Sequence, residues 1–174
     1  MEQKIISNKA LENKITYGLC AMFLASLLGM IFVIRPLDNT VGGGDLGWIA
    51  FSIGAVLGAC QGFMLINRRL IEASEKAEKA MLLLFCAVSV GFLAATFAGC
   101  TNYHFAHTPR TYQAPIIGKW RSGGKSNSFF LYVIVMQRKE QVVVSEKMWD
   151  KSVKGQSIKV KVYDGLLGFP IIEL

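Results

Sequence analysis

Apolar residues form three long uncharged runs in the first part of the chain. The runs cover residues 15–34, 46–66 and 80–100, and none of them contains Asp, Glu, Lys, Arg or His. About 20 apolar residues in a helix that rises about 1.5 Å per residue are enough to cross the hydrocarbon core of a bilayer. A buried helix of a soluble protein seldom lacks charge on every face over that length. The pattern therefore predicts three transmembrane helices.

Beyond the third run, the apolar positions follow a strand-like period. The stretch "SIKVKVY" alternates between apolar and polar residues, and "FFLYVIVM" is apolar on both faces, as expected for a central strand. Three more short stretches complete five predicted strands: "APIIGKW", "QVVVS" and "GFPIIEL". Between the third and fourth strands, "SEKMWDKSVKG" predicts a short helix that begins at Ser145, a good N-cap, and stops at Gly155.

These elements predict a membrane α-helical protein with a small C-terminal all-β barrel of the OB or SH3-like type. The expected divisions are a cytoplasmic N-terminus over residues 1–14, a three-helix transmembrane domain over 15–110 and the β domain over 111–174. The stretch "VVVSEKMWDKSVKGQSIKVKVYDGLLGFPII" resembles the end of many uncharacterised bacterial inner-membrane proteins. It is also distantly similar to the OB barrel of NfeD-type membrane proteins. This resemblance covers roughly the last third of the chain, implies an adaptor-like barrel and transfers no catalytic residue.

The chain is basic, with 19 Lys and Arg against 12 Asp and Glu, and the placement of these charges predicts its orientation. Lys and Arg near the ends of membrane spans are more frequent on the cytoplasmic side. The N-terminus and the second loop, which lie on one side, carry Lys4, Lys9, Lys14, Arg68, Arg69, Lys76 and Lys79. The first loop and the residues after the third span, on the opposite side, carry only Arg35, Arg110 and Lys119. This predicts a multi-pass protein of the bacterial inner membrane, with its N-terminus in the cytoplasm and its β domain in the periplasm.

The second run carries small residues at every fourth position, namely Ala50, Gly54, Gly58 and Gly62. On a helix these residues form one ridge, which lets the backbone of another helix approach closely. The ridge predicts helix packing, either against another span of the same chain or against a second copy or a partner protein.

Four residues at the ends of the runs are expected at the membrane interface: Trp48, Arg68, Arg69 and Tyr103. The first loop, "RPLDNTVGGGDLGW", contains three consecutive glycines and is expected to be a flexible outer turn. Its two carboxylates, Asp38 and Asp45, leave cation binding open as an alternative.

Cys100, His104 and His107 are the candidate metal ligands of the chain. They share a face if the third helix continues until Pro109, and sulfur with imidazole suits zinc or copper. Three ligands at the end of a helix are a weak signal, so we expect no metal and no other cofactor.

The stretch "GKWRSGGKS" approaches the pattern of a phosphate-binding loop but departs from it in spacing by one residue. The residues after it favour a strand, so the helix N-terminus that would hold a phosphate is missing. We therefore expect a hairpin turn over residues 122–127. The uncharged spans also disfavour ion-coupled transport, which places ionisable side chains within the membrane.

The β domain is expected to act by binding. It has ten Lys and Arg against five Asp and Glu, but no His or Cys and no catalytic constellation. The leading hypothesis is a non-catalytic accessory or assembly subunit that binds a partner protein through this domain. The alternative is a membrane immunity protein or a phage or toxin exclusion protein. Expected contacts are membrane lipids and a protein partner or a second copy, and nucleic acid is not expected.

Overall fold

The computed structural model describes residues 2–68, 70–71, 76–123 and 128–173. Its contacts divide the chain into two compact units. One unit, the helical unit, consists of Met1–Ile34 and Gly47–Ala98, and the other, the β unit, consists of Arg35–Leu46 and Gly99–Leu174. The contacts therefore do not divide the chain at residue 111, because the β unit takes in the first loop and the residues that follow the third span.

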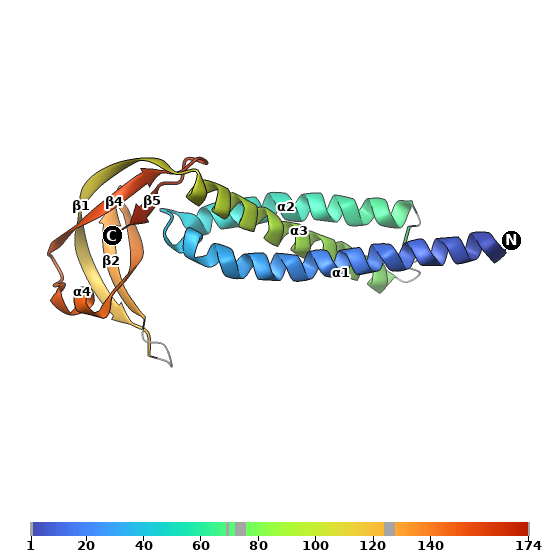
Figure 1. Cartoon of the computed structure of the whole chain (residues 1–174), viewed down its shortest axis with the longest axis horizontal. Coiled ribbons are helices and arrows are strands. Elements are labelled where there is room, and N and C mark those ends of the chain that lie inside the picture. The colour runs from blue at the N-terminus through green and yellow to red at the C-terminus, as the bar shows by residue number, and fades with distance from the viewer. Residues whose placement is uncertain (1, 69, 72–75, 124–127, 174) are drawn as a thin grey trace. The chain divides into compact units, whose positions relative to one another are not determined.

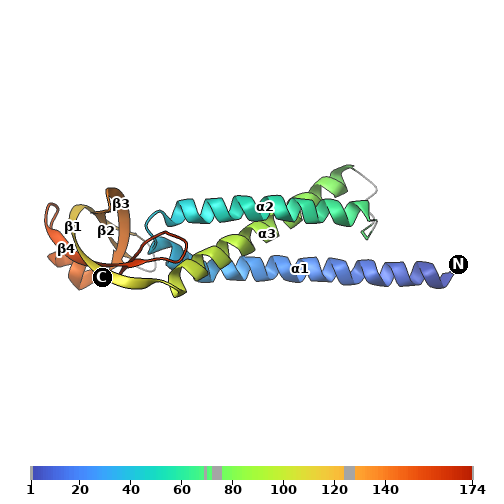
Figure 2. The same ribbon diagram turned by 90° about the horizontal axis from the view of Figure 1, so that it is seen from above.

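The helical unit contains most of three long helices (Figures 1 and 2), namely α1 (Glu2–Asp38), α2 (Gly43–Asn67) and α3 (Lys76–His104). All three are long and apolar enough to cross a membrane. The three predicted spans are confirmed, and each helix extends beyond its apolar run. Pro36 lies inside the last turn of α1.

Large apolar side chains cover the outer surface of these helices. In water such a surface would be unfavourable, whereas in lipid it is the expected one. The exposed set includes Leu24, Leu28, Ile31 and Phe32 of α1, Ile53, Val56 and Leu57 of α2, and Met81, Leu84 and Phe97 of α3.

The small residues of α2 face α3. A Cβ atom added at Gly54 would lie 2.6 Å from the carbonyl oxygen of Val90, and one added at Gly58 would lie 2.9 Å from the Cα of Ala87. Both distances are shorter than a carbon atom tolerates, so the two backbones meet only because these residues lack side chains. Gly62 has more room, and Ala50, one turn before Gly54, is partly buried. The ridge packs within the chain, which is the first of the two predicted possibilities.

Helix α3 packs against α1 as well as against α2. The rings of Phe23 and Phe85 lie 4.8 Å apart, and a Cβ added at Gly29 would lie 3.0 Å from the side chain of Thr96. Figure 2 shows α3 running between the other two helices. The helices of this unit are thus held together by close van der Waals contact between their surfaces and not by ionised groups. This is expected in lipid, where the hydrophobic effect does not drive helices together.

The β unit is built on a curled antiparallel sheet with the strand order β3-β2-β1-β4-β5. Its elements are β1 (His107–Arg121), β2 (Phe129–Val135), β3 (Arg138–Val144), α4 (Glu146–Lys151), β4 (Ser157–Asp164) and β5 (Ile171–Glu173). The predicted five-stranded, barrel-like domain is confirmed, and it is a half-barrel whose two edges are β3 and β5. Strand β1 is longer than predicted. Its first part, up to Pro115, pairs with β4, and its second part, from Ile116 onward, pairs with β2 with a register shift between Ile116 and Gly118.

Hairpin connections join β1 to β2 and β2 to β3, and only the first of these two turns was predicted. Met136 and Gln137 both have positive φ, of 49° and 65°, as a two-residue turn that matches the twist of the strands requires. In the β1–β2 connection, the amide of Ser122 donates to the carbonyl of Ser128 over 2.9 Å. Residues 124–127 of the near-phosphate loop lie outside the described part. The element after the connection is a strand, as predicted.

Helix α4 begins where the sequence predicts and ends earlier. The side chain of Ser145 accepts a hydrogen bond from the amide of Met148, which confirms the N-cap. The predicted end at Gly155 is wrong, because the chain becomes extended at Ser152, and Gly155 instead takes a positive φ of 90° in the turn before β4. The ring of Trp149 packs on Phe129, with centroids 5.6 Å apart, and covers one end of the core.

Two alanine substitutions on the ridge test the packing of α2 on α3. Gly58→Ala should lower the free energy of unfolding by about 1–3 kcal/mol, because its methyl group meets the main chain of Cys86 and Ala87. Gly62→Ala should stay within about 1 kcal/mol of the wild type, since its nearest neighbours lie 3.2–3.4 Å away and alanine favours the helix. Thermal unfolding in a neutral detergent measures both. Equal effects of the two substitutions would contradict this packing.

Candidate functional site

The loop between α1 and α2 is an additional strand-like piece of the β unit. The amide of Val41 donates to the carbonyl of Pro170, and the amide of Ile172 donates to the carbonyl of Asn39, each over 2.7 Å. Thr40 and Ile171 are the antiparallel partners at the centre of this pairing. The prediction of a flexible outer turn is therefore wrong, because main-chain hydrogen bonds hold residues 39–41 along the outer edge of β5.

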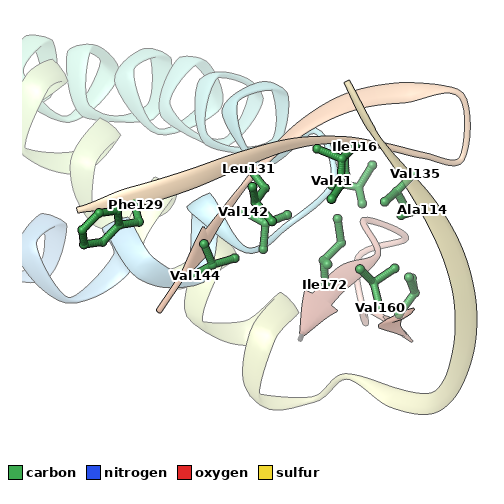
Figure 3. Close-up of a cluster of buried hydrophobic side chains, with 12 residues drawn as sticks. Val41, Ala114, Ile116, Phe129, Leu131, Val135, Val142, Val144, Val160 and Ile172 are labelled. Carbon is green, nitrogen blue, oxygen red and sulfur yellow. The ribbon is translucent and has the colours of Figure 1, made fainter. Parts of the chain in front are cut away.

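The same loop contributes to the hydrophobic core of the half-barrel. Val41 is 5% exposed and belongs to the cluster formed by the inward residues of the sheet (Figure 3). Thr40 is also buried, and its hydroxyl donates to the carbonyl of Pro36 over 2.7 Å. Burial on this scale requires that the loop and the sheet fold as one structure.

The far end of the loop meets the opposite edge of the sheet. The amide of Gly42 donates to Oε1 of Glu140 on β3 over 3.2 Å, and Nη1 of Arg138 pairs with Oδ2 of Asp45 at 3.0 Å. Gly42 has a φ of 69°, a backbone conformation that glycine adopts without strain. Residues 39–45 thus span the opening between β5 and β3. We call the line along which they meet β3 the seam.

A pocket of about 300 Å³ opens beside the seam. One wall comes from the loop and the other from β2 and β3, with Phe130, Gln141 and Val143 on the outer face of the sheet and Glu140 on its inner face. The lining residues are Leu37, Asp38, Thr40, Gly42, Gly43, Gly44, Asp45, Phe130, Glu140, Gln141 and Val143. With Arg138 engaged by Asp45, this is a locally acidic spot on a basic domain, and it offers carboxylate oxygens beside an apolar wall.

Burial at the seam raises the pKa of Glu140 above its ordinary value of 4.5. The hydrogen bond from Gly42 and the positive charge of Arg138 act in the opposite direction, and the carboxylate of Asp45 raises the pKa further. Glu140 is thus a half-buried carboxylate held at the junction between loop and sheet.

A second junction ties the end of α3 to the connection between β4 and β5. The side chain of Asn102 is fully buried, and its Nδ2 donates to the carbonyl of Phe169 over 2.8 Å while its Oδ1 accepts from the amide of Leu167 over 3.0 Å. Gly165 packs directly on this amide group, with no space for a side chain. The hydroxyl of Tyr103 donates to Glu173 over 3.4 Å. Sequence reasoning missed Asn102, although a lone amide just after an apolar run was an available signal.

The outer face of β1, β2 and β3 carries exposed apolar and aromatic side chains. Trp120, Phe130 and Val143 are cross-strand neighbours in one row, and the rings of Trp120 and Phe130 lie 5.0 Å apart. Trp120 is 48% and Val143 52% exposed. In the next rows, Ile134 is exposed and the amine of Lys139 lies 4.5 Å from the centre of the Tyr132 ring. Such a face is typical of a surface that contacts another molecule.

The residues predicted for the membrane interface lie in different surroundings. Trp48 is exposed near the start of α2 and packs edge-on against Phe51, and Arg68 is exposed just after α2 ends. Arg69 lies outside the described residues. Tyr103 has a hydrogen-bond partner in β5, so its position is determined by the β unit. Contact of these residues with lipid headgroups stays a prediction.

The candidate metal site is not formed. Helix α3 ends at His104 and His107 begins β1, so Cys100, His104 and His107 do not share the helical face that the spacing suggested. Among the described residues, no group of three or more His, Cys, Asp or Glu is placed to hold a metal ion. Of the two first-loop carboxylates, Asp45 pairs with Arg138, and cation binding by them stays a hypothesis. The condition for a shared face, a helix that continues to Pro109, is not met, because pairing with β4 takes the chain into a strand at His107.

Comparison with known proteins gives no assignment for these residues, because no family model, curated protein or solved structure matches the chain. The similarity to NfeD-type barrels stays a prediction. What the seam can do chemically follows from its own groups, which are carboxylates, main-chain donors and acceptors, and an apolar wall. These groups suit binding through charge and hydrogen bonds.

The raised pKa of Glu140 predicts a defined pH dependence of stability. The folded state binds this proton more tightly than the unfolded state, so the contribution is fully present below pH 4.5 and is lost as the pH rises through the folded-state value. Glu140→Gln keeps an oxygen to accept from Gly42 but removes the charge. It should therefore unfold at a higher temperature than the wild type near neutral pH, and the difference should disappear in acid.

Thermal unfolding of both proteins across this pH range measures the effect. Glu146→Gln, at an exposed carboxylate in the first turn of α4, controls for the loss of one negative charge. A Glu140→Gln variant that is less stable than the wild type at neutral pH would contradict the prediction.

Proposed function

We propose that the protein is a non-catalytic membrane subunit whose β domain binds another protein. The observation that carries this proposal is the seam, where a loop between two membrane helices forms part of the wall of the β domain. Together with the junction at Asn102, it ties the domain to three helix ends. A domain held in this way is suited to keep a bound partner at the membrane.

Two further observations support binding over transport or catalysis. The spans contain no ionisable residue within their apolar runs, and such residues usually mark ion and proton pathways. The β domain also carries the apolar and aromatic face with Trp120, Phe130 and Val143. Aromatic side chains of this kind are enriched at protein interfaces.

We further propose that the protein lies in a bacterial inner membrane with its N-terminus in the cytoplasm and its β domain on the opposite side. The support is the excess of Lys and Arg near the N-terminus and in the second loop. The first loop and the residues after α3 belong to one compact unit, which fits three crossings of the bilayer with both segments on one side.

Cysteine labelling of intact cells tests this orientation. A cysteine replacing Lys154, in the exposed turn before β4, should react with a membrane-impermeant maleimide added outside the cytoplasmic membrane. A cysteine replacing Arg68, just after α2, should react only after the membrane is opened. The wild type supplies the background from its four native cysteines, which all lie in the helices. The reverse labelling pattern would place the β domain in the cytoplasm.

Site-specific photo-crosslinking tests the partner. A photoreactive residue in place of Trp120 or Val143 should give a discrete adduct with a foreign protein in living cells, because both positions lie on the exposed apolar face. The same residue in place of Lys159, exposed on β4, is the matched control and should give no adduct. If the two face positions give no adduct in folded protein, or react as the control does, the proposed function is wrong.

A further inference from the structure

One edge of the β sheet has main-chain groups without partners. Strands β2 and β3 are joined by a two-residue turn, and Val135 pairs with Arg138 at its base. In such a hairpin the closing pair is hydrogen-bonded, and hydrogen-bonded pairs then alternate along the strand. The N–H and C=O groups of Lys139, Gln141 and Val143 therefore point away from β2. Within the part of the chain that the structure describes, no main-chain group pairs with them.

The other edge of the sheet, β5, does have main-chain partners. Strand β5 is paired along its outer side by residues 39–41. At β3 the loop makes side-chain contacts instead, from Gly42 to Glu140 and from Asp45 to Arg138. The loop thus covers one edge of the half-barrel and leaves the other able to accept a strand.

The space along this free edge is shaped and charged. The pocket beside the seam is lined by Gln141 and Val143 of β3, by Phe130 of β2 and by the glycines of the loop. Its carboxylates are Asp38, Asp45 and Glu140. The cation beside them is Arg138, which is paired with Asp45, whereas the amine of Lys139 lies over the Tyr132 ring. Among the side chains that the structure describes, neither Asp38 nor Glu140 forms an ion pair, although the charge of Arg138 acts on Glu140 from a distance.

We propose that the free edge of β3 binds an extended segment of a partner protein by strand addition, with a Lys or Arg of that segment entering the pocket beside Asp38 and Glu140. This rests on the proposed function and names its binding site. Main-chain hydrogen bonds to Lys139, Gln141 and Val143 would provide affinity for any extended segment. The carboxylates of the pocket would make binding specific for a segment with a basic side chain. The exposed side chain of Val143 and the partly exposed ring of Phe130 provide an apolar surface beside the added strand.

A foreign segment fits this edge better than a second copy of the chain. Two copies paired through β3 about a two-fold axis would bring both loops, and both sets of carboxylates, to one interface. Like charges placed opposite each other are unfavourable, whereas a basic segment meets the carboxylates with opposite charge.

Binding of synthetic peptides to the full-length chain in neutral detergent tests the proposal. The probes are an alternating valine–lysine heptapeptide and the matching valine–glutamate heptapeptide, followed by fluorescence anisotropy. The lysine peptide should bind, and the glutamate peptide should bind about tenfold more weakly or not at all. On binding, amide exchange should slow at Lys139, Gln141 and Val143, and stay unchanged at Glu140 and Val142, which already donate to β2.

A pair of variants separates the main chain from the side chain. Gln141→Pro removes an N–H that points to the free edge, where proline is tolerated in strands, and should weaken binding of the lysine peptide about tenfold. Gln141→Ala keeps that N–H and should bind as the wild type does. If Gln141→Pro fails to fold, amide exchange of the wild-type protein with and without the lysine peptide tests strand addition in its place.

Several outcomes would overturn strand addition. They are equal binding by Gln141→Pro and wild type, equal loss in Gln141→Pro and Gln141→Ala, equal binding of both peptides, or no binding of the lysine peptide. A dimer in native mass spectrometry that Gln141→Pro dissociates would assign the edge to a second copy. If a partner found by crosslinking at Trp120 stays bound to Gln141→Pro, the proposed function stands and strand addition is wrong.

Discussion

The main-chain hydrogen bonds between residues 39–41 and β5 are the interaction on which the β unit depends. A three-residue edge strand is too short to be stable alone, and because Ile171 and Ile172 are buried, the main-chain groups of β5 require partners within the protein. Pairing with the loop satisfies them and at the same time brings Val41 into the core and Gly42 to Glu140. Strands β1 to β5 by themselves would lack one core side chain and one wall, so the half-barrel is completed by chain that lies between two membrane helices.

The helical unit meets a different constraint, because lipid is as apolar as the side chains that face it. Association then requires close contact, and glycine provides it at Gly54 and Gly58, where the main chain of α3 occupies the place of a side chain. The serine hydroxyls buried in the unit bond to carbonyls of their own helices, as Ser26 does to Phe23 and Ser89 to Phe85. These two hydroxyls are thus satisfied within their own helices, whereas the buried hydroxyl of Thr96 has no hydrogen-bond partner among the described residues.

The proposal that the free edge of β3 binds a partner rests on what the rest of the β unit already occupies. The core is closed by Trp149 and Val41, the β5 edge is paired, and the α3 junction is occupied by the Asn102 amide. What is left unsatisfied is one row of main-chain groups beside carboxylates and an apolar face. An extended basic segment would satisfy all three, and the ties to the helix ends would keep it at the membrane.

The amino-acid sequence alone determined the three spans, the small-residue ridge, the five strands and the N-cap at Ser145. Each of these depends on local periodicity or on a few adjacent residues, which is where propensity and pattern carry information. Only the tertiary structure decided the role of the first loop, the end of α3 at His104 and the seam. Thr40 and Ile171 are paired although they lie near opposite ends of the sequence. The three glycines that follow Val41 have the composition of an ordinary turn, so the sequence gives no sign of this pairing. Pairing between distant segments is determined by which edges and core positions the assembled sheet leaves unfilled, and no local pattern contains that information.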